Sequence, residues 1–517
     1  MTRKTIAEYT TAIVTILVLG IALARPTINH FPAFIHAWAQ SDWYSLAIGF
    51  HNNGFDFLHP ETLIYNKQFP NLWMTDNGTT VTSVDFPIHV YIAALLMNLF
   101  GTTAPWVFRI WTLAVSLVGL WFLFLLCRRI TGNLTKSLTV VCVAVTSPVY
   151  AYYFNGFLPS MPSLALVFGG LWAYIAYLQE KKLKYWHLAI ASLALATLIR
   201  TSQAVPFVAV CCFEVFRWIF CRKEYNFNKI QILPIAVSFI AIVGYMIWNA
   251  HLRAANGSLF LNSLMPAKSL EEARTVIDTM EWRKFRYFSE IQHFIVGETV
   301  LAAVAYIILK RIKVSRDSLI WFTAIYSFGA LLFFVAMFVQ FQNHDYYFLD
   351  SLFTPIILIF ILTIKQLPEL NRWWKAIPAV LLVVFGCTMY NAAKHDIRII
   401  LNQSDRALEC NRNYEGSAQW LDSIGISRNA KILTLGAYPQ NSPFIKMERK
   451  GYTAMSTNKR LVDNVILFNF DYVIIEDNID ETDKENISYV LAQLDRIDGN
   501  GKISIYKRKA TETKNEN

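Results

Sequence analysis

Asp42 is a carboxylate whose neighbours could make it reactive. It lies just past a first apolar stretch, in the run His36-Ala-Trp-Ala-Gln-Ser-Asp-Trp-Tyr44, with aromatic residues on both sides. A carboxylate that is partly removed from water can accept a proton from a hydroxyl group. Capping explains the same residue type equally well, because Ser41 or Asp42 can accept a hydrogen bond from the first turn of a helix running through Ala47.

Asp85 is the second acidic side chain of interest. It opens an Asp-Phe-Pro element just ahead of the apolar run 89–100. Ionisable groups at the edge of apolar segments are costly to desolvate and are often functional. The elements on either side of Asp42 and Asp85 therefore decide what these two carboxylates can do.

The composition is that of a membrane protein. Hydrophobic residues make up 55% of the 517 residues and charged residues 16%, against roughly 25% charged in an average soluble domain. A soluble globular enzyme and a disordered chain are both excluded by this balance. The net charge of +10 comes mainly from cations at the ends of apolar runs, where they anchor topology against anionic lipid, so nucleic acid is not an expected partner.

The apolar runs predict a mainly α fold of about eleven transmembrane helices, each near the length that crosses the hydrocarbon core. The predicted spans lie near residues 9–24, 106–126, 136–154, 161–179, 185–199, 203–220, 231–250, 292–310, 318–340, 346–364 and 375–391. The run 89–100 is too short to span, and we expect it to lie at the outer interface.

The cations predict the orientation of these spans. With Arg3 and Lys4 in the cytoplasm, every connector that should be cytoplasmic is rich in Lys and Arg, as the positive-inside rule requires. The long connector 27–104, which contains both candidate carboxylates, then faces outward. The odd number of spans also places the C-terminus outside.

The composition changes beyond residue 395. Short β-rich runs alternate with helical stretches, as in a small α/β layer domain. The β-rich runs are 430–435, 471–476 and 502–506, and the helical stretches are 414–423, 459–468 and 484–494. We therefore expect a transmembrane domain over 1–395 and an extracytoplasmic α/β domain over 396–517, which binds an acceptor or covers the membrane face.

The first connector resembles that of GT-C glycosyltransferases that use polyprenyl-phosphate sugars, a group that includes the dolichyl-phosphate-mannose protein mannosyltransferases and the bacterial aminoarabinose transferase of lipid A. Members carry a His-x-Trp-x-Gln-x-Asp stretch, a Phe…Gly…Pro stretch and an acidic-Phe-Pro element. The matching residues are His36, Trp38, Gln40, Asp42, Phe50, Gly54, Pro60, Asp85, Phe86 and Pro87. The similarity covers residues 1–160 well and the later spans loosely.

This resemblance implies a membrane glycosyltransferase, a hexosyl or pentosyl transferase, with Asp42 as catalytic base and Asp85 as the second acidic site residue. It further implies that His36, Trp38 and Gln40 bind substrate. The sequence departs from the family pattern at three positions: Ala39 replaces a commonly basic residue, Asp85 is shorter than the usual Glu, and Ser160 stands where relatives often carry Asp.

The chemistry of such a site can be stated independently. A polyprenyl-phosphate sugar already carries a phosphate leaving group, so a carboxylate base and nearby cations suffice, and inversion is the expected outcome. The acceptor hydroxyl belongs to a lipid, a glycan or a protein. A bacterial inner membrane is the expected location.

Cations on the outer side run against the positive-inside bias and are candidates for the donor phosphate. They are Arg109, Arg200, Arg283 and Arg286, with Arg200 the first choice because it ends an apolar run. His344, Tyr346 and Tyr347 lie where the chain re-enters the membrane from outside and are further substrate-binding candidates. Snorkelling to lipid headgroups and an interfacial aromatic belt explain the same residue types.

Three alternatives stay open. His344 could join Asp42 and Asp85 around a divalent cation such as Mg²⁺ or Mn²⁺, although no spacing fixes a metal. A transporter or flippase of lipid-linked glycans should keep charged groups within several spans, and the predicted spans are nearly free of them. A polymerase or ligase using diphosphate-linked glycans would use the late outer connector 251–291.

Overall fold

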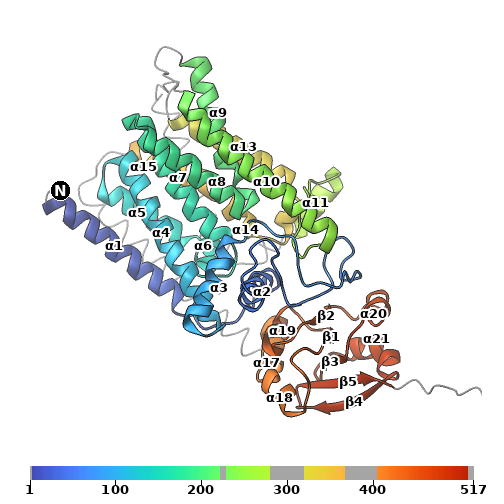
Figure 1. Cartoon of the computed structure of the whole chain (residues 1–517). Coiled ribbons are helices and arrows are strands. Elements are labelled where there is room, and N and C mark those ends of the chain that lie inside the picture. The colour runs from blue at the N-terminus through green and yellow to red at the C-terminus, as the bar shows by residue number, and fades with distance from the viewer. Residues whose placement is uncertain (1–2, 222–228, 280–318, 367–404, 510–517) are drawn as a thin grey trace, which may run out of the picture. The chain divides into compact units, whose positions relative to one another are not determined.

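The computed structural model describes residues 3–221, 229–279, 319–366 and 405–509 (Figure 1). The chain divides into two compact units. The helical unit comprises Met1–Ile28, Arg109–Met246 and Ser263–Asp396, and the loop–sheet unit comprises Asn29–Phe108, Ile247–Asn262 and Ile397–Asn517. The first connector thus groups with the C-terminal residues, while the predicted domain boundary near residue 395 stays a prediction.

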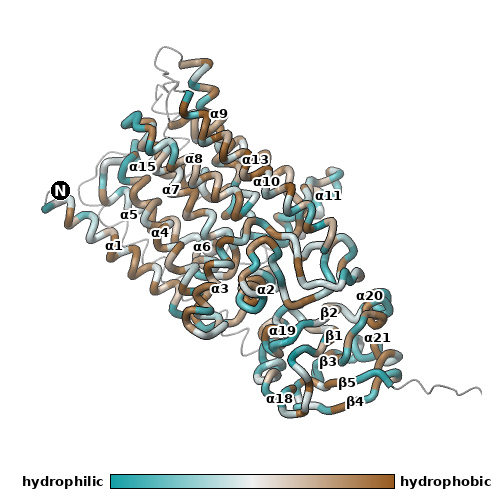
Figure 2. The backbone as a smooth tube through the Cα atoms, viewed as in Figure 1, coloured by the Kyte–Doolittle hydropathy of each residue, from teal (hydrophilic) through white to brown (hydrophobic). Residues whose placement is uncertain are grey.

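Helices, most of them apolar, lie wholly or largely in the helical unit. They are α1 (Arg3–Ala24), α4 (Pro105–Thr131), α5 (Leu134–Thr146), α6 (Pro148–Tyr153), α7 (Ser160–Glu180), α8 (Leu183–Ile199), η1 (Thr201–Gln203), α9 (Ala204–Phe220), η2 (Lys229–Gln231), α10 (Ile232–Asn256), α11 (Leu270–Thr279), α13 (Leu319–Ala336), η4 (Gln340–Gln342), α14 (Tyr346–Asp350) and α15 (Phe353–Gln366). Hydrophobic residues run along α4, α10 and α13 (Figure 2).

Six helical segments in the described part of the chain are long and apolar enough to cross a membrane. They are Thr5–Ala24, Pro105–Thr131, Ser160–Glu180, Thr201–Phe220, Lys229–Asn256 and Leu319–Ala336. The predicted mainly helical membrane protein is confirmed at this level, and the count of eleven spans stays a prediction. The predicted spans 292–310 and 375–391 lie outside the described residues.

Two predicted spans are divided in the structure. The run 136–154 forms α5 and α6, because Ser147 leaves the helical conformation and caps a new helix that starts at Pro148. The run 346–364 forms α14 and α15, with the break at Ser351, whose φ and ψ are −130° and −66°. Periodicity misses such breaks, since the apolar pattern continues across them.

Charged side chains within the predicted spans are paired. Arg217 Nη1 lies 3.1 Å from Glu214 Oε1 on α9, and the Tyr174 hydroxyl donates to the same oxygen at 2.7 Å. Asp350 is likewise buried within the run 346–364. The prediction of nearly charge-free spans is wrong at these positions, and pairing is what makes buried charge tolerable.

The loop–sheet unit contains the predicted α/β domain. Its helices are α2 (Ala37–Asn52), α3 (Ile88–Phe100), α17 (Arg406–Asn413), α18 (Ser417–Ser423), α19 (Ser442–Met447), α20 (Lys459–Val465) and α21 (Glu481–Leu491). Its strands are β1 (Ile432–Leu435), β2 (Gly451–Ala454), β3 (Tyr472–Glu476), β4 (Leu494–Gly499) and β5 (Ile503–Arg508), in the sheet order β2-β1-β3-β5-β4.

The three strands that the sequence predicts are β1, β3 and β5. Strand β1 pairs in parallel with β2 and β3, whereas β5 pairs antiparallel with β3 and β4. The sequence pattern misses β2, which has no apolar run, and β4, which has three charged residues among its six. Strand pairing with a buried neighbour stabilises both segments despite their weak intrinsic signal.

The first connector is hydrogen-bonded to the edge of this sheet. Tyr65 N donates to Gly451 O at 2.8 Å, and Gly451 N donates to Leu63 O at 3.0 Å. Asn66 adds a side-chain pairing with Thr453, because its amide donates to Thr453 O at 2.8 Å and accepts from Thr453 N at 3.0 Å. The connector therefore covers the exposed edge of β2.

Helix α2 packs closely against the same connector. A Cβ on Gly49 would lie 1.9 Å from the backbone oxygen of Glu61, so only glycine fits there. Nearly all of α2 is buried. Helix α2 packs on the connector, and the connector is hydrogen-bonded to the sheet. The position of α2 relative to the sheet is therefore fixed.

Candidate active site

Asp42 lies inside helix α2, which begins at Ala37. The cap position belongs to His36, which has a left-handed φ of 52° and makes no side-chain cap hydrogen bond. The Ser41 hydroxyl donates to Trp38 O at 2.8 Å. Capping by Ser41 or Asp42 is therefore wrong, and the Asp42 carboxylate is left for another role.

The Asp42 carboxylate is 2% exposed and accepts two short hydrogen bonds on the same oxygen. Gln440 Nε2 lies 2.6 Å and Asn441 Nδ2 2.7 Å from Asp42 Oδ1. Burial raises the pKa of Asp42 well above its usual range, while hydrogen bonds from Asn441, Gln440 and Trp38 act in the opposite direction. A carboxylate with a raised pKa accepts a proton more readily than an exposed carboxylate does.

Gln440 and Asn441 lie in the loop between β1 and α19, at the carboxyl end of β1, which pairs in parallel with β2 and β3. Loops at this end of parallel strands commonly carry functional groups. Sequence reasoning missed both residues. The polar pair that directly follows a buried strand was the available signal, but nothing local links it to Asp42.

Asp85 lies at a bend just before α3 and is half-buried. The backbone ahead of it is fixed on both sides, because Val84 N donates to Asn249 Oδ1 at 2.9 Å and the Ser258 hydroxyl donates to Ser83 O at 3.0 Å. Asp85 and Asp42 belong to the same compact unit. The role of Asp85 stays a prediction.

The other predicted residues on α2 hold the local structure. Gln40 Nε2 donates to Ile35 O at 2.9 Å. The Trp38 ring packs against Trp73 with 5.7 Å between ring centroids. Their predicted substrate contacts, and that of His36, therefore stay predictions.

A second cluster of predicted residues forms in the helical unit. Arg200 Nε lies 2.7 Å from Asp350 Oδ2, and the guanidinium carbon lies 5.3 Å from the ring centroids of both Tyr346 and Tyr347. His344 contacts the same two rings at 5.5 and 6.1 Å. Four candidates from distant parts of the sequence thus gather at one place, together with Asp350, which the sequence reasoning missed.

Two neighbours extend this cluster. The Ser202 hydroxyl donates to Asp350 Oδ2 at 2.8 Å. The Tyr153 hydroxyl donates to Asp345 Oδ1 at 2.7 Å. Both contacts fix carboxylates beside aromatic side chains.

Arg109 belongs to the helical unit as well. It is buried, donates to Asn155 O at 3.2 Å and lies 4.5 Å from the Phe157 ring centroid. Arg283 and Arg286 lie outside the described residues. The connector 251–291, which a polymerase or ligase would use, also lies partly outside the described residues.

The metal hypothesis gains no support from geometry. Among the described residues, no three His, Cys, Asp or Glu side chains gather closely enough to hold a metal ion. His344 belongs to the helical unit, whereas Asp42 and Asp85 belong to the loop–sheet unit. Whether a metal takes part stays open.

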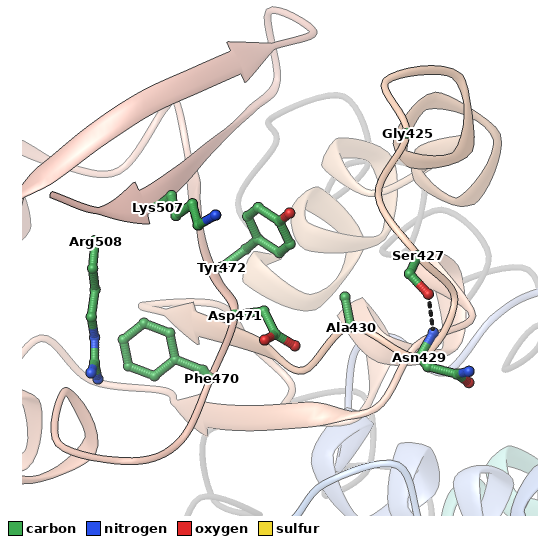
Figure 3. Close-up of a pocket in the computed structure, with 9 residues that line it drawn as sticks. All are labelled: Gly425, Ser427, Asn429, Ala430, Phe470, Asp471, Tyr472, Lys507 and Arg508. Carbon is green, nitrogen blue, oxygen red and sulfur yellow. Dashed lines mark hydrogen bonds between the residues drawn. The ribbon is translucent and has the colours of Figure 1, made fainter. Parts of the chain in front are cut away.

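A pocket in the C-terminal residues contains none of the predicted site residues (Figure 3). It is lined by Gly425, Ser427, Asn429, Ala430, Phe470, Asp471, Tyr472, Lys507 and Arg508. It lies at the amino ends of β1 and β3, opposite the end that carries Gln440 and Asn441. The Asp471 carboxylate accepts a hydrogen bond from Lys431 N at 2.8 Å, so it stabilises the backbone ahead of β1.

Comparisons with known proteins agree with the fold. Residues 85–248 match the family model of the dolichyl-phosphate-mannose-protein mannosyltransferases. This segment includes Asp85, Arg109 and Arg200 but not Asp42. A search of curated proteins found no sequence match.

Solved structures match over almost the whole chain. ArnT from Cupriavidus metallidurans, bound to undecaprenyl phosphate, is 10% identical over 97% of this chain and 98% of that chain, with a TM-score of 0.59. The oligosaccharyltransferase of Archaeoglobus fulgidus in the apo form is 10% identical over 90% and 69%, with a TM-score of 0.53. Mycobacterial arabinofuranosyltransferase AftD is 14% identical over 99% of this chain but 40% of its own, with a TM-score of 0.52.

At these identities the likeness establishes the fold. All three proteins are GT-C glycosyltransferases. The predicted resemblance is confirmed at that level, and the chain is an integral membrane protein with the GT-C glycosyltransferase fold.

Proposed function

We propose that this protein is an inverting glycosyltransferase that moves a sugar from a polyprenyl-phosphate donor to an acceptor hydroxyl on the extracytoplasmic face. The observation that carries the proposal is the buried Asp42 carboxylate, held by two amide donors in a chain with the GT-C fold. The undecaprenyl phosphate bound to ArnT supports a lipid-phosphate donor. The cation-rich alternate connectors support a cytoplasmic N-terminus and an outward first connector.

Asp42 acts as the general base in this mechanism. It accepts the proton of the acceptor hydroxyl, whose oxygen attacks the anomeric carbon of the sugar. The bond to the lipid phosphate breaks on the opposite face and the phosphate leaves with the electron pair, so the configuration inverts. A positioned base typically contributes 10²–10⁴-fold to the rate.

The departing phosphate needs compensating positive charge. Arg200 is our candidate, because its guanidinium lies near two tyrosine rings, 5.3 Å from each ring centroid, and pairs with the Asp350 carboxylate. Arg109 is the other described candidate. Asp85 is proposed as the second acidic residue of the site.

The test uses the purified full chain in lipid nanodiscs with polyprenyl-phosphate mannose, arabinose and aminoarabinose as donors. We expect Asp42→Asn to abolish transfer while undecaprenyl phosphate still binds. The matched control is Asp56→Asn, because the Asp56 carboxylate is about half exposed and, among the described residues, bonds to its own turn through His59 and Leu58. Equal transfer by Asp42→Asn and the wild type would disprove the mechanism.

A further inference from the structure

The Asp42 carboxylate is held by two consecutive amide side chains from the far end of the sequence. Gln440 and Asn441 each donate one N–H to Oδ1, at 2.6 and 2.7 Å. Both amide side chains are fully buried. Two donors on one oxygen fix the rotation of the carboxylate and leave Oδ2 as the oxygen that neither amide contacts.

Ser45 fixes the direction in which the Asn441 amide points. Its hydroxyl, one turn after Asp42 on α2, donates to Asn441 Oδ1 at 2.9 Å. The same hydroxyl oxygen accepts a hydrogen bond from Leu63 N at 3.2 Å. The hydroxyl proton is therefore the group that bonds to Asn441. A reversed amide would place oxygen against oxygen at Asp42, and the network therefore selects the N–H as the group that contacts Asp42.

Gln440 differs from Asn441 in one respect. Its Oε1 is buried and has no hydrogen-bond partner among the described residues. An unsatisfied buried oxygen costs free energy, and such groups in native structures call for an explanation. Placing the Gln440 N–H on Asp42 provides that explanation.

We propose that Gln440 and Asn441 are positioning residues that favour the ionised form of the Asp42 carboxylate against the effect of burial and hold the carboxylate in one orientation. This inference rests on the proposed function of Asp42 as base. Burial disfavours the charged form of a carboxyl group, and N–H donors favour it. The loop between β1 and α19 therefore completes the catalytic group, beyond binding an acceptor or covering the membrane face.

The first test is the pH dependence of sugar transfer by Gln440→Met and Asn441→Leu, which remove the donors at similar side-chain volume. We expect the acid limb of kcat to move up by about one pH unit for each variant, because a hydrogen bond to a charged group is lost. The rate should recover at high pH, and KM should change little. A loss of rate that is equal at every pH would overturn the proposal.

Ser45→Ala provides a milder variant in case an amide substitution prevents folding. It leaves both N–H donors in place and frees the Asn441 amide to rotate, so we expect a smaller shift in the same direction. Lys450→Met is the matched control: it removes the contact from the same sheet to Glu61, at 2.7 Å, without touching Asp42.

The second test needs no substrate. Infrared difference spectroscopy between acid and alkaline pH, with Asp42→Asn subtracted, follows protonation of the Asp42 carboxyl group directly. Tyr438, on the same loop, does not interfere, because burial raises its pKa to about 12, with Asp405 and Asp42 adding to the rise. We expect Asp42 to titrate at higher pH in both amide variants, and an unchanged titration would overturn the inference.

The two tests separate the inference from the proposed function. If the wild type transfers no sugar while the infrared titration still moves in the variants, the proposed function fails and the placement of the amide donors stands. If transfer depends on Asp42 while neither variant changes the titration of Asp42, the proposed function stands and the inference about the amide donors fails.

Discussion

Arg200 Nε lies 2.7 Å from Asp350 Oδ2, which joins the end of α8 to the end of α14 across 150 residues of sequence. The Asp350 side chain is fully buried, and that of Arg200 is 14% exposed. The Asp350 carboxylate also accepts from Ser202, while its Oδ1 has no hydrogen-bond partner among the described residues. A phosphate that binds Arg200 must therefore compete with a buried carboxylate.

Breaking this ion pair should destabilise the fold. We expect Asp350→Asn or Arg200→Gln to lower the free energy of unfolding by about 3–5 kcal/mol, because each leaves an uncompensated buried charge or polar group. The double variant should lose less than the sum of the two single losses. Thermal unfolding of the purified protein, followed by tryptophan fluorescence, measures these differences, and additive losses would show that the pair is not coupled.

The same pair should control affinity for lipid phosphate. We expect Arg200→Gln to weaken binding of undecaprenyl phosphate at least about tenfold, because a charge-assisted contact is lost. Asp350→Asn should leave affinity unchanged or strengthen it, since the competing carboxylate is removed. Lipid binding by native mass spectrometry gives both values, and a stronger loss in Asp350→Asn than in Arg200→Gln would contradict a phosphate role for Arg200.

Lys67 should make stability depend on pH. Its Nζ donates to Ile64 O at 2.7 Å and Thr79 O at 3.2 Å, and burial lowers its pKa from the ordinary value of 10.5 to about 7. Between these two pH values the unfolded chain binds the proton and the folded chain does not, so the contribution of Lys67 to stability rises with pH.

Lys67→Met removes this dependence. The melting temperature of the variant minus that of the wild type should therefore fall as the pH rises from 7 to 10. Lys484→Met is the control, because its Nζ pairs with Glu481 and its side chain is 43% exposed. A difference between Lys67→Met and wild type that stays constant with pH would refute the buried neutral amine.

Gly49 should tolerate no side chain. A Cβ there would lie 1.9 Å from Glu61 O, so Gly49→Ala forces α2 away from the connector and should cost about 1–3 kcal/mol or more. Gly244→Ala is the matched helical control, because nothing lies within 4 Å of its added Cβ. It should be neutral or stabilising by about 0.5–1 kcal/mol. Similar melting temperatures for the two variants would contradict the close approach.

Local patterns were sufficient for many of the helices, for three of the strands and for several candidate residues. Sustained hydrophobicity predicts the helices that the structure shows, because the length and polarity of a run decide whether it can leave water. The alternation of β-rich and helical runs predicts β1, β3 and β5 for the same reason. The sequence also predicts Arg200, His344, Tyr346 and Tyr347 one by one, whereas the structure shows that they gather.

The amino-acid sequence by itself therefore determined a membrane-embedded helical protein, an acidic first connector and a small α/β region, since hydrophobicity and backbone propensity act over a few residues. Only the tertiary structure decided that Gln440 and Asn441 bind the oxygen of Asp42 and that Asp350 neutralises Arg200. Contacts of this kind join residues that are 150 to 399 positions apart. No local preference encodes them, because they exist only after the helices and the sheet have packed.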